Sequence, residues 1–86
     1  MIGDRRIYLA PKEFRVLQLL MRHVGKVMGH DAILAHVWGT DRVGEQDLVK
    51  QYVYRLRQKI EPHADSPRFI HSVRGEGYYF EVPKSS

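Results

Sequence analysis

The segment at residues 47–60, DLVKQYVYRLRQKI, constrains the fold of this chain more than any other stretch. Its aliphatic residues are spaced by four, three and four positions. On an α-helix this spacing brings them within roughly 60° of one another. They are Val49, Val53, Leu56 and Ile60. The segment therefore predicts a helix that buries one narrow apolar stripe against the rest of a domain.

The opposite side of this predicted helix is polar and cationic. It carries Gln51, Tyr54, Arg55 and Gln58 in the middle, with Lys50 and Arg57 on one flank and Tyr52 and Lys59 on the other. The major groove of B-DNA admits a helix that presents donors in its middle and cations at its edges. A Lys- and Arg-rich face is often only a solvent-exposed face, so this helix alone leaves both interpretations open.

Length and composition limit the possible functions. The 86 residues and 43% hydrophobic content suit one domain over residues 1–86, with an ordered core at about 6–82. One small core leaves little room for a catalytic cleft and no nucleophile motif occurs, so we predict no enzyme. The net charge of +4 favours a polyanionic partner.

Several classes of site are disfavoured by missing residue patterns. Cysteine is absent, which excludes disulfides and Cys-ligated zinc and fits a reducing compartment. The five histidines show no metal-ligand spacing, so we expect neither a metal nor a cofactor. No apolar run approaches the roughly 20 residues that span a bilayer, and no signal-peptide pattern occurs. We therefore predict a soluble, cytoplasmic chain with no membrane partner.

Two further helices are predicted upstream, after a short amino-terminal strand at residues 5–10. The first runs from Pro11 to about Val24, and Gly25 is placed to end it. Its expected core stripe comprises Phe14, Leu17, Leu20, Met21 and Val24. The second runs from about His30 to Val37 after a brief extended link at 26–28. Its expected inward residues are Ile33, Leu34 and Val37.

Loops and a hairpin complete the predicted architecture. Residues 39–46, GTDRVGEQ, predict a loop that is either variable padding or a contact surface. Residues 61–68, EPHADSPR, end the cationic helix in a surface connection. The β-forming runs at 69–73 and 78–82 flank RGEG, which predicts a β-hairpin.

Three helices followed by a hairpin, with the third helix cationic, form the layout of a winged helix-turn-helix domain, a mainly helical α+β fold. In this layout the first two helices form a platform. The third, at about 47–60, enters the major groove, and the hairpin, at about 69–82, reaches the adjacent minor groove or backbone.

The chain resembles the effector domain of OmpR/PhoB-type response regulators, the output half of two-component signalling proteins, over residues 7–82. Four segments carry the resemblance: YLAPKEFRVLQLL, GKVMGHDAILAHVWG, YRLRQKIEP and FIHSVRGEGYYF. Each alone is weak, but all of them in order at the family spacing are specific. The resemblance implies sequence-specific binding of double-stranded DNA as the output of transcription regulation.

The resemblance also assigns DNA contacts to single residues. Arg55 would point at base edges and suits bidentate contact with guanine, worth about 1 to 3 kcal/mol of discrimination. Gln51, one turn earlier, suits adenine, and Ser72 in the hairpin completes the expected base contacts. The expected contacts with the backbone or minor groove are Lys50, Tyr52, Arg57, Lys59, Arg74, Tyr78 and Trp38. For Trp38, a buried packing role is equally open.

Further partners follow from the same resemblance. The loop at 39–46 matches a segment that contacts RNA polymerase, which predicts contacts by Thr40, Asp41, Arg42, Val43 and Glu45. Such proteins commonly bind direct repeats as a head-to-tail pair. They carry an amino-terminal receiver domain that is phosphorylated through a sensor histidine kinase, and a small four-stranded sheet ahead of the first helix. Neither the receiver nor the complete sheet is expected within this chain.

Departures from the family pattern and two rival functions remain. Ala10 stands where threonine is usual, which removes an N-cap worth about 1 kcal/mol, and Gly29 is a weak N-cap for the second helix. Glu76 at the hairpin tip would repel phosphate and leaves Arg74 to reach the DNA.

The first rival function is a protein-interaction module, in which the cationic helix faces an acidic partner. Such a module would show no steep salt dependence with duplex DNA. A general or RNA-binding domain would bind with an affinity that scarcely changes with sequence.

Overall fold

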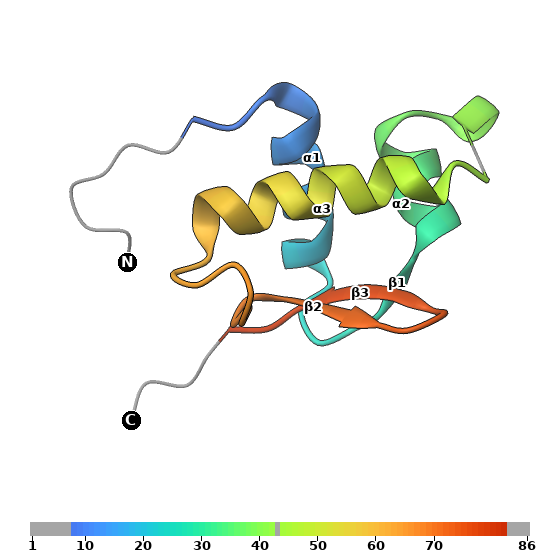
Figure 1. Cartoon of the computed structure of the whole chain (residues 1–86). Helices are drawn as coiled ribbons and strands as arrows, with labels where there is room; N and C mark the ends of the chain where they lie inside the picture. Colours follow the sequence, from blue (N-terminus) through green and yellow to red (C-terminus); the bar gives the residue numbers. More distant parts are fainter. Residues whose placement is uncertain (1–7, 43, 83–86) are drawn as a thin grey trace.

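The computed structural model describes residues 8–42 and 44–82 (Figure 1). Its helices are α1 (Pro11–Arg22), α2 (His30–Val37) and α3 (Gln46–Ile60), with a short 3-10 turn, η1 (Thr40–Arg42), before α3. Its strands are β1 (Met28–Gly29), β2 (Ile70–Val73) and β3 (Gly77–Phe80). The predicted mainly helical α+β class with a carboxyl-terminal hairpin is confirmed.

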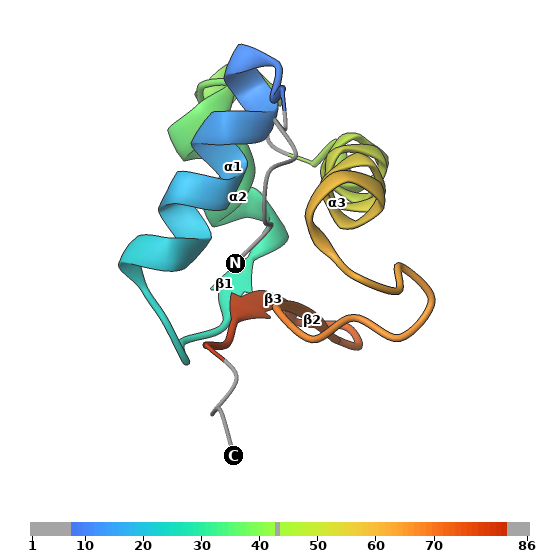
Figure 2. The same ribbon diagram turned by 90° about the vertical axis from the view of Figure 1, so that its left-hand side faces the viewer.

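The core lies where the helices meet one another and the sheet (Figure 2). From α3 it takes Val49, Val53 and Leu56, which are 0%, 1% and 0% exposed. Ile60, at the end of the same stripe, is partly buried against the core. The stripe predicted for this helix is therefore confirmed, and its burial decides which side of α3 stays outside.

The buried side of α1 differs from the prediction. Phe14, Met21 and Val24 are predicted in the core, but they are 51%, 49% and 51% exposed. Leu20, which was also predicted in the core, is fully buried, and Leu17 is partly buried against it. Val16 and Leu19 are buried in place of the three exposed residues. The helix carries apolar residues on most of its sides, so two overlapping stripes fit the helical spacing. Packing against α2 and α3 selects the stripe through Val16 and Leu20.

The two ends of α1 depend on single residues. Ala10 is the N-cap, and its methyl group accepts no hydrogen bond, but Glu13 Oε1 accepts the Ala10 N–H at 3.0 Å. The helix ends at Arg22 rather than Val24. Gly25 follows with φ of +81°, the left-handed conformation expected there, and its N–H donates to the Phe80 carbonyl oxygen at 2.9 Å. The end of α1 is thereby tied to β3.

The sheet is antiparallel, with the strand order β1, β3, β2. The β2–β3 hairpin confirms the prediction, whereas β1 falls in the predicted link, because two residues are too few to show alternation. β1 pairs Met28 with Tyr78 and Gly29 with Gly77. A Cβ at Gly77 would lie 1.9 Å from the Met28 carbonyl oxygen, so this close pairing requires glycine. The pairing holds the hairpin against the start of α2.

The prediction for α2 is confirmed, and the one for an amino-terminal strand is not. α2 has its predicted bounds, and its inward residues, Ile33, Leu34 and Val37, are buried. Of the predicted strand at residues 5–10, residues 5–7 lie outside the described part of the chain, and 8–10 form no strand.

Within the described residues, no helix is long and apolar enough to cross a membrane, and no three His, Asp or Glu side chains gather as metal ligands.

Glu61 fastens the hairpin to the end of α3. The sequence predicts a surface connection here, but Glu61 is only 8% exposed. Its carboxylate accepts the backbone N–H groups of Arg68, Phe69 and Ile70 at distances from 2.7 to 3.2 Å. A buried carboxylate with this many backbone donors is fully satisfied. The start of β2 is thereby held at a set position beside α3.

Candidate nucleic-acid interface

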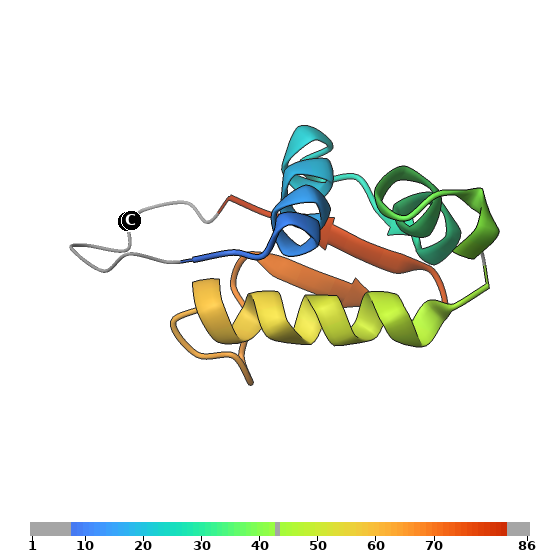
Figure 3. The same cartoon turned by 90° about the horizontal axis from the view of Figure 1, so that it is seen from above.

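The outer face of α3 is a continuous polar surface. Gln51, Tyr54, Arg55 and Gln58 are all exposed on the side opposite the buried stripe. Figure 3 shows α3 along one edge of the molecule, with the β2–β3 hairpin alongside it. The predicted base readers on the helix, Gln51 and Arg55, thus lie on one accessible surface.

The two flanks of α3 have different neighbours. The wing flank, with Lys50 and Arg57, faces the hairpin, and the platform flank, with Tyr52 and Lys59, faces α1 and α2. On the wing flank, a groove of about 440 Å³ lies between α3, the hairpin and the start of α2. Its lining includes His30, Lys50, Ser72 and Arg74. Lys50 and Arg74 make this groove cationic.

Arg57 joins α3 to the hairpin. Its Nε and Nη2 donate to the Ile70 carbonyl oxygen at 3.3 and 3.0 Å, and Nη2 also donates to Ser72 Oγ at 2.8 Å. The guanidinium lies 5.9 Å from the centre of the Tyr78 ring. Ser72 accepts from Arg57 and therefore keeps its own O–H for another acceptor. Two residues that the sequence assigned to separate DNA contacts thus form one cluster.

Tyr78 supports this cluster from the sheet. It is 6% exposed and lies opposite Ser72 in the hairpin register. Burial raises the pKa of its phenol above the ordinary 10.0, although the Arg57 guanidinium acts in the opposite direction. The hydroxyl therefore remains a donor at neutral pH. The His30 ring meets the Tyr78 ring edge-on, with the ring centres 5.5 Å apart.

Lys59, on the platform flank, is engaged within the protein. Its Nζ lies 2.6 Å from Glu13 Oε1, and Glu13 is 3% exposed. Burial alone would raise the pKa of Glu13. Hydrogen bonds from Lys59 and the Ala10 N–H outweigh that effect and lower the pKa from the ordinary 4.5. This geometry directs Lys59 toward α1, so it does not support the phosphate contact predicted for it.

Trp38 and Tyr52 pack together at the other end of the platform flank. Trp38 is the C-cap of α2, and its ring centre lies 4.9 Å from that of Tyr52 in an edge-on arrangement. The Arg55 guanidinium lies 5.0 Å from the centre of the Tyr52 ring. Trp38 therefore has the packing role that the sequence left open beside phosphate contact.

The predicted polymerase-contact loop is tied to α2. Asp31 Oδ1 accepts the Gly44 N–H at 3.2 Å, and Arg42 pairs with Glu45 at 3.4 Å. Val43 lies outside the described residues. The remaining predicted contact residues, Thr40, Asp41, Arg42 and Glu45, are exposed.

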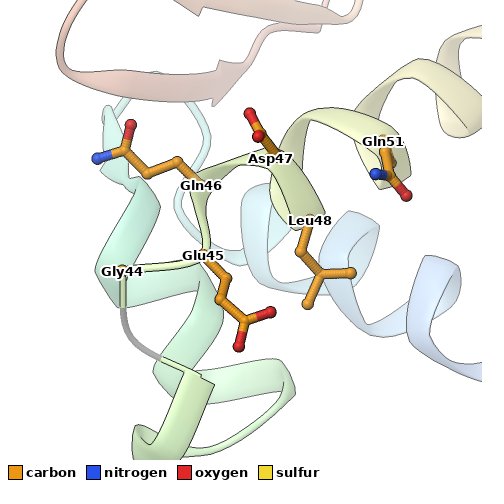
Figure 4. A pocket seen from close by; sticks show the side chains of 6 residues that line it. All are labelled: Gly44, Glu45, Gln46, Asp47, Leu48 and Gln51. Atoms are coloured by element: carbon orange, nitrogen blue, oxygen red, sulfur yellow. The ribbon is translucent and has the colours of Figure 1, made fainter.

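A shallow hollow marks the start of α3 (Figure 4). Glu45 and Asp47 line it, and their side chains point in opposite directions. Carboxylates stabilise a helix amino terminus but repel phosphate. The cationic surface of α3 therefore begins one turn later, at Lys50.

Three residues that shape this region were missed by sequence reasoning. His30 lines the groove, Glu13 holds Lys59, and Glu61 holds the hairpin. For Glu13 the partner is 46 residues away along the chain, so no local pattern connects them. For Glu61 the only available signal is its position directly after the helix, where a carboxylate can accept backbone donors.

Comparisons with known proteins agree with this geometry. The chain matches the family described as "Transcriptional regulatory protein, C terminal" over residues 4–80. It is 40% identical over 78 residues to the alkaline phosphatase synthesis transcriptional regulatory protein SphR of Synechococcus elongatus, covering 91% of this chain and 30% of SphR.

Two solved structures extend the comparison. The response regulator DrrB of Thermotoga maritima, an OmpR/PhoB homolog, has a TM-score of 0.81 at 32% identity, covering 91% of this chain and 35% of DrrB. The DNA-binding domain of RstA from Klebsiella pneumoniae, solved in complex with the RstA box, has a TM-score of 0.75 at 32% identity, covering 94% of this chain and 80% of that domain chain.

The fold and these matches define a winged-helix, DNA-binding domain of a transcriptional regulator. The chain belongs to the family of transcriptional regulatory protein carboxyl-terminal domains, in its OmpR/PhoB-type response regulator branch, as the resemblance predicts. Its relatives are transcriptional regulators, not enzymes. The chain spans about a third of their length, namely 30% of SphR and 35% of DrrB.

Proposed function

We propose that this domain binds double-stranded DNA sequence-specifically in the cytoplasm, with α3 in the major groove and the β2–β3 hairpin on the adjacent backbone or minor groove. The outer face of α3 carries the proposal, because it exposes Gln51 and Arg55 together on the side away from the core. The acidic residues Glu45 and Asp47 are confined to the start of the helix.

Base reading falls to Arg55 and Gln51. The guanidinium of Arg55 suits the two acceptors of guanine, and the amide of Gln51 suits the donor and acceptor of adenine. Ser72 was expected to read a base as well. Its hydrogen bond with Arg57 favours a different role, in which the hydroxyl and the guanidinium donate together to one backbone phosphate.

Backbone contacts fall mainly to the wing flank. Lys50 and Arg74 line the cationic groove, which has room for phosphate oxygens between α3 and the hairpin. Ser72 lines the same groove, Arg57 donates to Ser72 from α3, and Tyr78 remains a candidate hydroxyl donor there. Three cations at phosphates give a log-log salt slope of about −2.7.

The longer protein supplies regulation in this proposal. A receiver domain that is phosphorylated through a sensor histidine kinase controls the output, and two copies bind a direct repeat head to tail. Phe14 and Met21 of α1, together with Val24 just after its end, are large apolar residues exposed on the surface. They support an upstream contact, because such groups favour burial by other parts of a protein. The loop with Thr40, Asp41, Arg42 and Glu45 contacts RNA polymerase.

The test is selection of binding sites from random duplexes, followed by affinity measurements on single variants. Arg55→Ala should relax the preference at one base pair, at a cost of about 1 to 3 kcal/mol on the selected site. Lys50→Ala should weaken selected and random duplexes equally and make the salt slope about 0.9 shallower. Equal losses on both duplexes for both variants would refute this division of roles.

A further inference from the structure

Trp38, Tyr52 and Arg55 form a row from the end of α2 to the outer face of α3. Tyr52 is half-buried, and the edge-on contact with Trp38 holds its ring from the platform side. Arg55 follows three positions later, one turn along the same helix, and its guanidinium lies 5.0 Å from the Tyr52 ring centre. The row therefore connects a packed aromatic ring with an exposed cation.

The ring contact limits where the Arg55 guanidinium can go. An arginine side chain has many rotamers, and a flat ring beside the guanidinium favours those in which the two groups stack. No hydrogen bond or ion pair joins Arg55 to another side chain of the described residues. Its donors thus stay available while its orientation is restricted, which is the requirement for bidentate recognition of a base edge.

We propose that Tyr52 is a positioning residue for Arg55, and that Trp38 holds the Tyr52 ring in place for this purpose. The inference rests on the proposed function, in which Arg55 reads a base. It replaces the phosphate contact expected for the Tyr52 hydroxyl with a role for the ring. Tyr52 then contributes to the choice of sequence rather than to general affinity for DNA.

The two possible roles of Tyr52, positioning of Arg55 by the ring and phosphate contact by the hydroxyl, predict different effects of the same substitutions. Tyr52→Phe keeps the ring and removes the hydroxyl, whereas Tyr52→Leu removes the ring. If the ring positions Arg55, the phenylalanine variant keeps full base preference. The leucine variant then loses about two- to fivefold of the preference at the base pair read by Arg55, which is the range of an exposed cation–π contact. Preferences at other base pairs and the salt slope stay unchanged.

The experiment uses the site selected by the wild-type domain and duplexes with each base pair substituted in turn. Arg55→Ala identifies the base pair that Arg55 reads. Tyr8→Leu is the control, because Tyr8 is also a tyrosine, is 80% exposed and lies ahead of α1, outside the surface proposed to meet DNA. It should leave the preference at that base pair intact. Thermal unfolding checks that each variant is folded. Tyr52→His retains a flat ring, so it should keep more of the preference at the base pair read by Arg55 than Tyr52→Leu does.

Three outcomes would overturn the inference. A uniform loss of affinity for all duplexes in Tyr52→Phe would assign the residue to a phosphate. Full base preference in a folded Tyr52→Leu would leave the ring without a positioning role. A wild-type domain that binds all duplexes equally would refute the proposed function itself. This result can be told from the first two because it is seen in the wild-type protein, before any variant is measured.

Discussion

The two flanks of α3 carry similar residues but behave differently. Each flank has a long cationic side chain near the end of the helix, Arg57 on one side and Lys59 on the other. Arg57 reaches the hairpin and lies beside an open cationic groove. Lys59 reaches back to the buried carboxylate of Glu13. One cation therefore lies at the proposed DNA surface, and the other holds α3 against α1.

This difference shows that the neighbour of a cation, and not its place on a helical wheel, decides its role. Two buried acids fix the surroundings of α3: Glu13 binds Lys59 on the platform flank, and Glu61 at the C-cap holds the start of the hairpin beside the helix end. Arg57 joins the wing flank to the hairpin. The outer face can then present Gln51 and Arg55 from a helix that is fixed on both flanks. Substitutions of these anchors and of the flank cations test the contrast directly.

The largest effect is expected for Glu61→Ala. The change leaves the part-buried N–H groups of Arg68 and Phe69 and the buried N–H group of Ile70 without their acceptor, at a cost of about 3 kcal/mol of unfolding free energy. Urea unfolding measures this loss. Asp65→Ala, which removes an exposed acid from the same connection between α3 and β2, serves as the control and should cost less than about 0.5 kcal/mol. Equal stability of both variants would mean that Glu61 is no anchor.

Glu13→Ala should have the next largest effect, about 2 kcal/mol, because it removes the acceptor for both Ala10 N–H and Lys59. Lys59 is partly exposed and can regain water, which keeps the loss below that of a fully buried pair. Thermal unfolding should show a midpoint lower by roughly 8 to 16 °C. The DNA affinity of the folded variant should be unchanged, and a loss of affinity would contradict the separation of the two flanks.

A comparison of Lys50→Ala with Lys59→Ala separates the flanks by salt dependence. Lys50→Ala should make the log-log slope of DNA affinity about 0.9 shallower, since one phosphate contact is lost. Lys59→Ala should leave the slope unchanged and reduce stability instead. Fluorescence anisotropy at several salt concentrations gives both slopes. If Lys59→Ala also makes the slope shallower, Lys59 leaves Glu13 to reach the DNA.

The smallest effect concerns pH. The folded state lowers the pKa of Glu13 below the ordinary 4.5, so its ionised carboxylate stabilises the fold at any pH above that value. This contribution is lost as the pH falls below about 4.5 and through the lower pKa of the folded state. Urea midpoints measured between pH 6 and pH 3 should therefore fall less steeply in Glu13→Gln than in the wild type. Parallel curves would show that Glu13 does not titrate in this way.

Sequence reasoning succeeded where a periodic pattern had only one solution. In α3 a single stripe fits the spacing of Val49, Val53 and Leu56, and the helix buries that stripe. In α1 two stripes overlap, and Phe14 and Met21 were assigned to the wrong one. Helical period gives relative angles within an element, but the rotation of that element is decided by its tertiary neighbours.

For the candidate site, the sequence predicted which residues are exposed, but not which side chains contact one another. Gln51, Arg55 and Lys50 were placed on the outer surface because their positions follow from the buried stripe. The pairing of Lys59 with Glu13, and that of Arg57 with Ser72, joins segments far apart in the chain. No local pattern encodes such contacts. The two-residue strand β1 was likewise too short to leave a signal.

The central claim is that the outer face and wing flank of α3 meet DNA while the platform flank does not. Amide NMR shifts measured during titration with the selected duplex test it most directly. We expect the largest changes at Lys50, Gln51 and Arg55 and in the hairpin near Arg74, with little change around Glu13. Unmoved signals at Gln51 and Arg55, with changes confined to α1, would contradict it.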